Sequence, residues 1–406
     1  MIPVRCITGH AAHADWRTAL DLALGDLLAD RQTATARAAE GLADAVDFPL
    51  GLCYFSDHFA AAAEQILAEL QRCLPRVSWA GTVGRGIFAD EIEYLDEAAL
   101  VLMLFPFPRE CFRLFSGVQP LVPESTEFQA HAALVHADGR TPDLQELLPE
   151  LAERTASGYL FGGLSASRTR SVQIADQVFD GGGLSGIAFS SEAGIVSRVT
   201  QGCQPIGPRR LVTRVQHNAV VSLDGRSALD CAFQDLGLPP DIALEPALAR
   251  LSNTLVGLRS SEDMEIVAPA AFGADMLVRH IVGVDPRAGV VAIADEIEPG
   301  SWLIFCRRDP AAALSDLRRA AREIRDELFD SERVALGCVY VSCSGRGGHH
   351  FGKSAAELDV IRDVLGGELP LAGFLAGGEI AHGRLYGYTG VLTVFSAPRP
   401  AGQFQR

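Results

Sequence analysis

Five polar residues in the last part of the chain could bind a ligand or take part in chemistry. Cys343 and Arg346 follow one apolar run, Glu379 follows the next, and His349 and His350 lie between them. A thiol beside an imidazole can act as a nucleophile, and a guanidinium can bind a carboxylate through two hydrogen bonds. Together, Arg346 and Glu379 would suit a zwitterion such as an amino acid, with one charge for each end.

The residues around these side chains predict strands that end in glycine-rich loops. Residues 334–343 and 369–375 are strand candidates, 354–365 is a helix candidate, and 389–396 is a closing strand. Polar groups on loops held by rigid strands commonly form binding or catalytic sites. We therefore expect the loops after the first two strands to carry the site.

The pattern strand, helix, strand, strand occurs three times, over residues 48–105, 128–190 and 334–396. In each copy the second strand ends in small residues, which predicts three equivalent loops around one cleft. For any single loop, a tight turn or a bulge is the simpler interpretation. The small residues are Gly81 and Thr82, Gly162 and Gly163, and Gly373.

Alternating strands and helices with closing strands predict an α/β fold of the mixed α+β kind, in which helices flank mixed sheets. The length of 406 residues suits two or three domains. We place one domain at residues 1–225, with the first two copies of the pattern. The other, at residues 226–406, contains the third copy.

Charge and composition disfavour several partners and locations. The net charge of −16 repels nucleic acid and anionic membranes on average, so we expect neither as a partner. The nine cysteines form no C-x-x-C pair, which indicates neither a disulfide framework nor a zinc site and favours a reducing compartment. With no signal-peptide pattern and no apolar run of bilayer length, we expect a cytoplasmic protein.

The string Gly347–Ser354 satisfies the phosphate-binding pattern G-x-x-x-x-G-K-[ST]. An extra polar segment precedes it, two bulky histidines lie inside it, and little chain follows for the rest of a P-loop fold. We interpret the match as accidental.

The ordered motifs resemble the FIST sensory proteins, which pair an N-terminal with a C-terminal FIST domain. The likeness covers nearly the whole chain after about residue 48. In the first half it lies in residues 81–87, 161–164, 183–189 and 200–207. In the second half it lies in residues 284–285, 343–347, 351–352, 371–374 and 378–380.

The resemblance implies a sensor of small molecules, amino acids among them, that signals to a separate protein such as a histidine kinase or a cyclic-dinucleotide enzyme. Two departures bear on the ligand: Thr82 stands where the family often has cysteine, and residues 388–390 replace the usual Asn-Gln-Thr. The ligand-binding candidates are Cys343, Arg346, Gly347, Gly373, Gly378, Glu379, Gly162, Gly163, Ser165, Gly81, Thr82 and Cys203.

Two alternatives stay open. Some relatives bind haem and sense nitric oxide, and the candidate haem ligands here are His349, His350, His58 and His217. No other metal site is predicted. A cysteine-dependent enzyme would use Cys343 with His349 and Glu379. Because common hydrolase motifs are absent from the sequence, we expect a binding protein and no catalytic residues.

Overall fold

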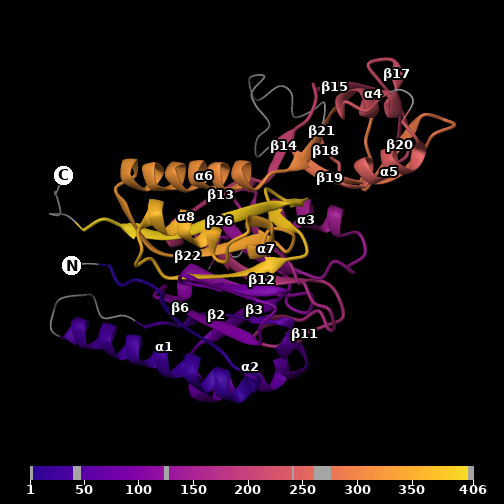
Figure 1. Ribbon diagram of the computed structural model, residues 1–406. Helices are drawn as coiled ribbons and strands as arrows, with labels where there is room; N and C mark the ends of the chain where they lie inside the picture. Colours follow the sequence, from indigo (N-terminus) through magenta and orange to yellow (C-terminus); the bar gives the residue numbers. More distant parts are fainter. Residues whose placement is uncertain (1–2, 40–46, 123–127, 240–241, 260–275, 401–406) are drawn as a thin grey trace. The chain divides into compact units, whose positions relative to one another are not determined.

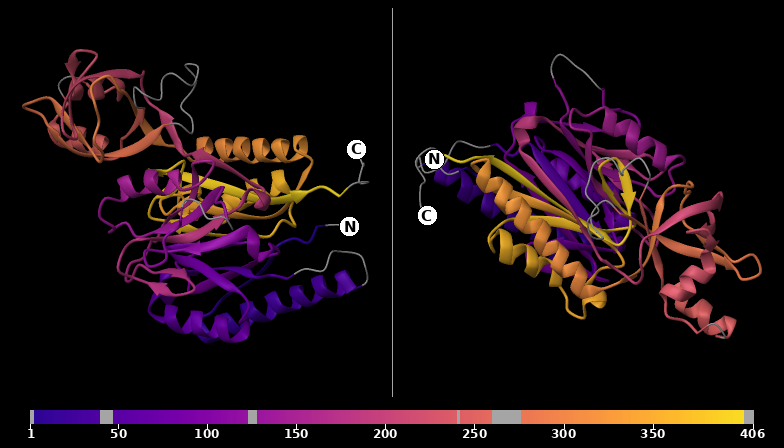
Figure 2. Two further views of the ribbon diagram at one scale, coloured as in Figure 1. Left: turned by 180° about the vertical axis from the view of Figure 1, so that it is seen from behind. Right: turned by 90° about the horizontal axis from the view of Figure 1, so that it is seen from above.

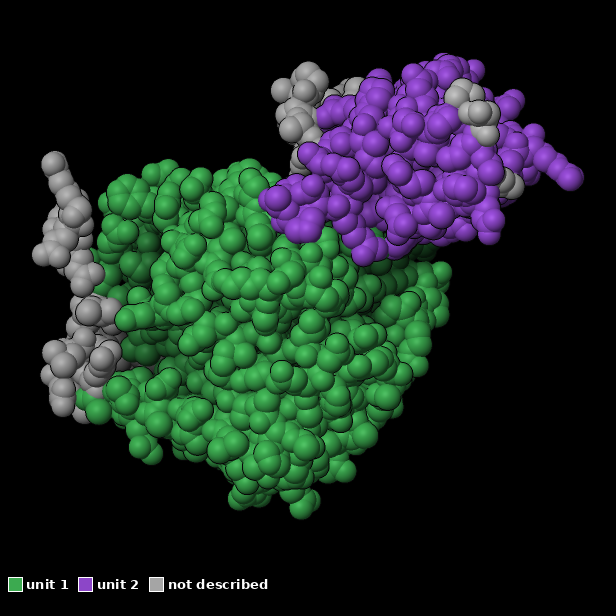
Figure 3. All heavy atoms as spheres, viewed as in Figure 1, with its two compact units in different colours: residues 1–199, 314–406 green, residues 200–313 purple. Residues whose placement is uncertain are grey.

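The computed structural model describes residues 3–39, 47–122, 128–239, 242–259 and 276–400. The chain forms two compact units (Figure 3): unit 1 has residues 1–199 and 314–406, and unit 2 has residues 200–313. The boundary predicted near residue 225 lies inside unit 2. This division differs from the one based on sequence, because the third copy of the strand pattern folds with the first two in unit 1.

Unit 1 contains three six-stranded mixed sheets with the same core (Figure 1). Each core has two parallel strands and a closing strand antiparallel to the first of them. The predicted mixed α/β fold is thus confirmed. The cores are β2 (Leu50–Ser56), β3 (Ser78–Gly84) and β6 (Ala99–Phe105); β8 (Ala132–Ala137), β9 (Tyr159–Leu164) and β12 (Leu184–Phe189); and β22 (Arg333–Cys343), β23 (Leu371–Ala376) and β26 (Thr389–Pro398).

Each sheet is completed by a hairpin that follows the second core strand of another sheet. The hairpin β4–β5 (Gly86–Ala89 and Ile92–Leu95) adds to β23. The hairpin β24–β25 (Glu379–Ala381 and Arg384–Tyr386) adds to β9, and β10–β11 (Gln173–Ala175 and Val178–Phe179) adds to β3. These exchanged hairpins, which the sequence analysis did not predict, link the three sheets. The opposite edges are β1 (Ile7–Ala12), β7 (Phe112–Phe115) and β13 (Ile195–Gln201).

Helices cover the outer faces of the sheets (Figures 1 and 2). The core strands β2 and β6 are buried along their whole length, which explains why they are apolar without alternation. On the first sheet lie α1 (Trp16–Ala39) and α2 (Ala63–Cys73), on the second α3 (Leu144–Glu153), and on the third α6 (Pro310–Asp330) and α8 (Ala356–Leu365). The helix predicted at residues 354–365 is α8.

Unit 2 has an eight-stranded sheet in which neighbouring strands are antiparallel. Its strands β15 and β16 form a hairpin with the turn at His217. Within the described ranges, no helix combines the length and the apolar character needed to span a membrane. The strands of unit 2 are β14 (Cys203–Pro205), β15 (Arg210–Gln216), β16 (Ala219–Leu223), β17 (Arg226–Ser227), β18 (Leu255–Arg259), β19 (Leu277–Asp285), β20 (Val290–Ile293) and β21 (Trp302–Arg308), and its helices are α4 (Ala228–Asp235) and α5 (Leu244–Ser252).

Candidate functional site

The ends of the second core strands β3, β9 and β23 lie side by side in unit 1. Three backbone hydrogen bonds join them: Ala166 to Val83 (3.1 Å), Gly377 to Leu164 (3.1 Å) and Arg85 to Leu375 (3.2 Å), each with the amide of the first residue as donor. Loops that are far apart in the sequence therefore share one region of the molecule.

Three of the predicted glycines are required by the packing of their own sheets. A Cβ atom at these positions would lie about 2 Å from a carbonyl oxygen of the neighbouring parallel strand. The close approach explains these glycines without a ligand. The pairs are Gly81 with Cys53 (1.9 Å), Gly162 with Val135 (2.0 Å) and Gly373 with Tyr340 (1.9 Å).

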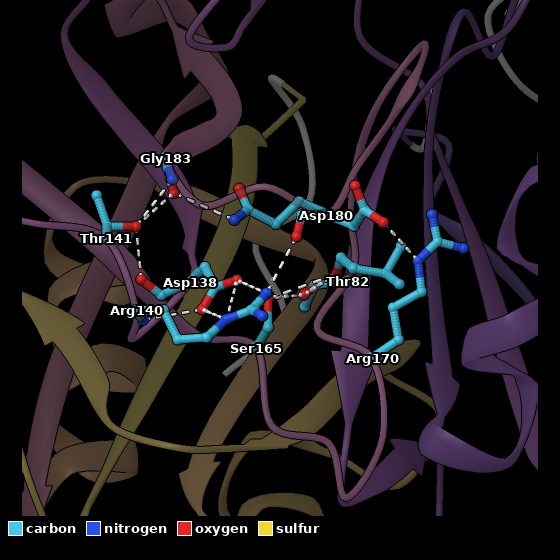
Figure 4. Close-up of polar contacts among 10 residues, drawn as sticks. Thr82, Asp138, Arg140, Thr141, Ser165, Arg170, Asp180 and Gly183 are labelled. Carbon is cyan, nitrogen blue, oxygen red and sulfur yellow. Dashed lines mark hydrogen bonds and ion pairs between the residues drawn. The ribbon is translucent and has the colours of Figure 1, made fainter.

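Two other predicted residues, Thr82 and Ser165, meet across the first and second sheets. Their hydroxyl oxygens lie 2.8 Å apart, and Thr82 Oγ1 donates to the carbonyl oxygen of Val172, also at 2.8 Å (Figure 4). Both residues are buried. This pair fixes the start of the loop that follows β9.

A hollow of about 410 Å³ opens beside Ser165, and we call it the strand-end hollow. All three copies of the strand pattern contribute to its wall, which is rich in hydroxyl groups. The lining residues are Arg85, Asp138, Gly139, Arg140, Ser165, Ala166, Ser167, Thr169, Ser171 and Ser344.

Asp138 and Arg140, which both line the strand-end hollow, form an ion pair. Asp138 is 2% exposed and accepts hydrogen bonds from Arg140 Nη2 at 2.6 Å and from the Arg140 amide at 2.9 Å (Figure 4). Burial opposes ionisation of Asp138, but the hydrogen bonds from Arg140 outweigh it and lower the pKa of the carboxyl. The pair therefore stays ionised and adds no net charge.

Arg85 differs from the neighbouring arginines because it has no acidic partner among the described residues. Arg168 is paired with Asp57 at 2.7 Å, and Arg170 with Asp180 at 2.8 Å. The Nε atom of Arg85 is buried without a hydrogen-bond partner in the described part of the chain. Among the described residues that line the strand-end hollow, Arg85 is thus the cation without an acidic partner. It lies between the end of β3 and the start of β4.

Arg346, a predicted ligand-binding residue, lies in the protein interior. It is 1% exposed, and its Nη2 atom lies 2.7 Å from Oε1 of Glu357 on α8. The hydroxyl of Tyr340 donates to the same oxygen at 2.6 Å. Arg346 is thus ion-paired with Glu357, and it also lies near enough to Glu379 for the two charges to act on each other.

Glu379 is completely buried, and this burial favours the protonated form of its carboxyl group. Its Oε2 atom accepts hydrogen bonds from Oγ1 of Thr389 at 2.7 Å and from the Thr389 amide at 3.1 Å. Its Oε1 atom is buried without a hydrogen-bond partner in the residues the structure describes. Burial raises the pKa of Glu379 to about 8.

The thiol of Cys343 lies near Glu379. Burial and this neighbouring carboxyl raise the pKa of the Cys343 thiol to about 12, which disfavours a nucleophilic thiolate.

The candidate haem ligands lie at the surface or near it. His349 is exposed and His350 partly exposed on the short helix α7 (Gly348–Phe351), and His58 and His217 are exposed. Haem binding needs an axial ligand inside an apolar pocket. Over the ranges that the structure describes, no group of three or more histidine, cysteine or acidic residues could hold a metal ion.

An internal carboxylate occupies the loop that matches the phosphate-binding pattern. Oε1 of Glu93, from β5, accepts a hydrogen bond from the amide of Gly348 at 2.9 Å, and Oε2 accepts one from the amide of Ala355 at 2.7 Å. Lys353 is paired with Asp359. The amides that would bind a phosphate are therefore already used by the protein itself.

The other predicted residues are three glycines of unit 1 and one cysteine of unit 2. Gly163 packs against the third sheet, where a Cβ atom would lie 2.8 Å from Val341 Cγ1. Gly347 and Gly378 lie in the loops after β22 and β23. Cys203 is buried on β14 of unit 2. Glu379 is the sheet partner of Gly163 and lies near enough to Cys343 and Arg346 to act on their pKa values, so the structure brings these four predicted residues together in unit 1.

Three residues at or near the strand-end hollow were not predicted from the sequence: Arg85 and Asp138, which line it, and His136. Arg85 lies inside a motif that was noticed only for its glycines, and Asp138 directly follows β8, as many site residues follow strands. His136 is completely buried and 3.1 Å from the hydroxyl of Tyr54, and burial lowers its pKa to about 3. It is therefore neutral and a poor proton carrier at physiological pH.

Comparisons with known proteins match two family domains in succession, which meet near the boundary predicted at residue 225 and not at either end of unit 2. The FIST N domain matches residues 49–226, and the FIST C domain matches residues 230–382. An uncharacterized protein of Mycobacterium tuberculosis (strain CDC 1551 / Oshkosh) is 29% identical over 358 residues, which are 82% of this chain and 87% of the relative. An uncharacterized protein of Mycobacterium bovis is 28% identical over 364 residues, 83% of this chain and 88% of the relative.

Proposed function

Because the chain belongs to the family defined by the FIST N and FIST C domains, we propose that it is a sensory protein that binds a small anionic metabolite. FIST domains are associated with sensory signal transduction and with the binding of small ligands. The binding site in this proposal is the strand-end hollow. The observation that carries it is Arg85, a guanidinium without an acidic partner in the described part of the chain, in a wall of hydroxyl groups.

The chemistry of the strand-end hollow suits a carboxylate. A guanidinium binds a carboxylate through two parallel, charge-assisted hydrogen bonds, and serine and threonine hydroxyls can donate or accept further ones. The volume of about 410 Å³ lies within the usual range for small-molecule sites. An amino acid is a suitable ligand: Arg85 would bind its carboxylate, and hydroxyl or carbonyl oxygens would accept from its ammonium group.

Binding would also give a plausible route to a signal. A ligand held by Arg85, Ser165 and Ser344 would connect loops from all three copies of the strand pattern. The ligand would bind most tightly to the arrangement of these loops that gives it the best contacts. Binding would therefore increase the population of that arrangement. The output partner in this proposal is a separate signalling protein, such as a histidine kinase or a cyclic-dinucleotide enzyme, and the chain acts as a binding protein and not as an enzyme.

The test is a thermal-shift and calorimetric screen of the full chain against amino acids, dicarboxylates and inorganic phosphate. A ligand at a hundredfold over its dissociation constant should stabilise the chain by about 2.7 kcal/mol. The variant Arg85→Met should lose this stabilisation, because the apolar side chain cannot bind an anion.

The matched control is Arg72→Met, since Arg72 is an exposed arginine paired with Glu69 on the same helix. It should bind like the unmodified chain. Equal affinity in Arg85→Met, or no response to any anion in the panel, would overturn the proposal. A ligand that depends on Glu379, tested with Glu379→Gln, would favour the earlier hypothesis of a site at Glu379.

A further inference from the structure

A second hollow, of about 510 Å³, lies in unit 1 where α6 ends and β22 begins. We call it the basic hollow, because Arg5, Arg325, Arg333 and Arg399 line it together with a single acidic residue, Glu368. The first described residues, the end of α6 and the end of β26 meet on this side of unit 1, at the left of Figure 1.

The charge of the basic hollow contrasts with that of the chain, which has a net charge of −16. Arg333 has no carboxylate partner among the described residues, and its Nε and Nη2 atoms donate to the hydroxyl and carbonyl oxygens of Ser396 at 2.8 and 2.7 Å. Arg325 is paired with Asp326 at 2.8 Å, whereas Glu368 offers Arg5 little compensation, because its side chain is 94% exposed and 3.7 Å away. An anionic partner would therefore complete the coordination of Arg333.

An exposed aromatic side chain lies beside these cations. Phe329, near the end of α6, is 67% exposed, and the guanidinium of Arg399 lies 5.6 Å from the centre of its ring. Arginine and aromatic residues are the residue types most enriched at protein–protein interfaces, where they often supply much of the binding energy. A small inorganic anion would bind the arginines but would leave the Phe329 ring exposed to solvent.

We propose that the basic hollow docks an acidic peptide segment of a partner protein, with an apolar side chain of the segment against Phe329 and carboxylates on Arg333 and Arg399. A peptide fits better than a nucleic acid, because four arginines in one hollow do not form the long basic stripe that tracks a phosphate backbone, and the rest of the chain is acidic. This surface would serve the output of the sensor. It shares no residue with the strand-end hollow.

The test selects binders from a library of random peptides displayed on phage, with the full chain as the bait. The test variant is Arg333→Ala/Arg399→Ala, and the control Arg72→Ala/Arg76→Ala removes the same charge from exposed positions elsewhere. Selected peptides are then measured by fluorescence anisotropy. We expect acidic peptides with at least one large apolar residue, and an affinity that falls with added salt.

The double variant at Arg333 and Arg399 should bind the selected peptides about tenfold more weakly or worse, and the control within about twofold of the unmodified chain. Phe329→Ser, which changes an exposed side chain, should also weaken binding. Selection of peptides without acidic residues, or equal affinity in the double variant, would overturn the proposal. The proposal would also be overturned if an oligonucleotide or inorganic phosphate displaced the bound peptide at a concentration lower than that of the peptide. Arg85→Met should still bind the selected peptides. The peptide test at the basic hollow and the anion test at the strand-end hollow can then fail independently of each other.

Discussion

The guanidinium of Arg346 and the carboxylate of Glu357 form an ion pair at 2.7 Å with both side chains almost completely buried. The hydroxyls of Tyr340 and Ser342 complete the coordination of Glu357, at 2.6 and 2.9 Å. This network joins β22 to α8 inside the third sheet. The arginine of the family-like motif therefore acts first as a structural residue in this chain.

Replacing Arg346 with alanine should destabilise the chain by about 3–5 kcal/mol, because Glu357 would stay buried without its cation. Urea unfolding followed by circular dichroism would measure the loss. The control Lys353→Ala removes an exposed ion pair with Asp359 and should cost less than about 1 kcal/mol. If Arg346→Ala unfolded at the same urea concentration as the control, the pair would have no structural importance.

Glu379 should make the chain less stable as the pH rises. Its pKa is about 8 in the folded chain, against 4.5 as the ordinary value, so between these values the folded state binds one proton more than the unfolded state. The free energy of unfolding therefore falls as the pH rises through this window, by about 5 kcal/mol at most, and the full stabilisation is present only below the pKa of the unfolded state.

The variant Glu379→Gln should remove this dependence, since an amide of the same shape does not titrate. Urea unfolding at pH 5, 7 and 9, conditions chosen around the window, would compare the two chains. The variant should gain stability over the unmodified chain as the pH rises. Parallel curves for the two chains would show that Glu379 is already ionised in the folded state.

The glycines at the crowded strand positions should not tolerate a methyl group. Gly373→Ala would place a Cβ atom 1.9 Å from the carbonyl oxygen of Tyr340, and we expect a loss of about 3 kcal/mol or more, or no folded protein. Gly25, inside α1, is the matched control, because a Cβ atom there meets nothing within 4 Å. Gly25→Ala should stabilise the helix by up to about 1 kcal/mol. Equal melting temperatures for the two variants would contradict the packing explanation.

The strands and helices of unit 1 were predictable because their patterns are local. Runs such as Ala99–Phe105 are buried on both faces, and the spacing of apolar residues in α2 and α6 repeats at the helical period. The exchanged hairpins were not predictable. Their strands have two to four residues, and the sheet that each one joins is decided by contacts between distant parts of the chain.

The candidate site was harder to predict, for a related reason. Arg346 and Arg85 are both arginines next to glycines, and only the fold shows that Glu357 neutralises the first while the second has no acidic partner among the described residues. The contact between Thr82 and Ser165 also joins residues 83 positions apart. Residue types and motifs cannot show how charges pair within the fold, and this pairing is what distinguishes Arg85 from Arg346.

Cys343 should react slowly with iodoacetamide, although the residue itself is partly exposed. With the thiol pKa raised to about 12, only a minute fraction is thiolate near neutral pH, and the thiolate is the reactive form. Cys73 is a suitable internal reference, because it is also partly exposed, on α2. Mass spectrometry of tryptic peptides after timed labelling should show Cys343 modified at least about tenfold more slowly than Cys73, with the difference disappearing in urea. Rapid labelling of Cys343 in the folded chain would instead return the cysteine-dependent enzyme to consideration.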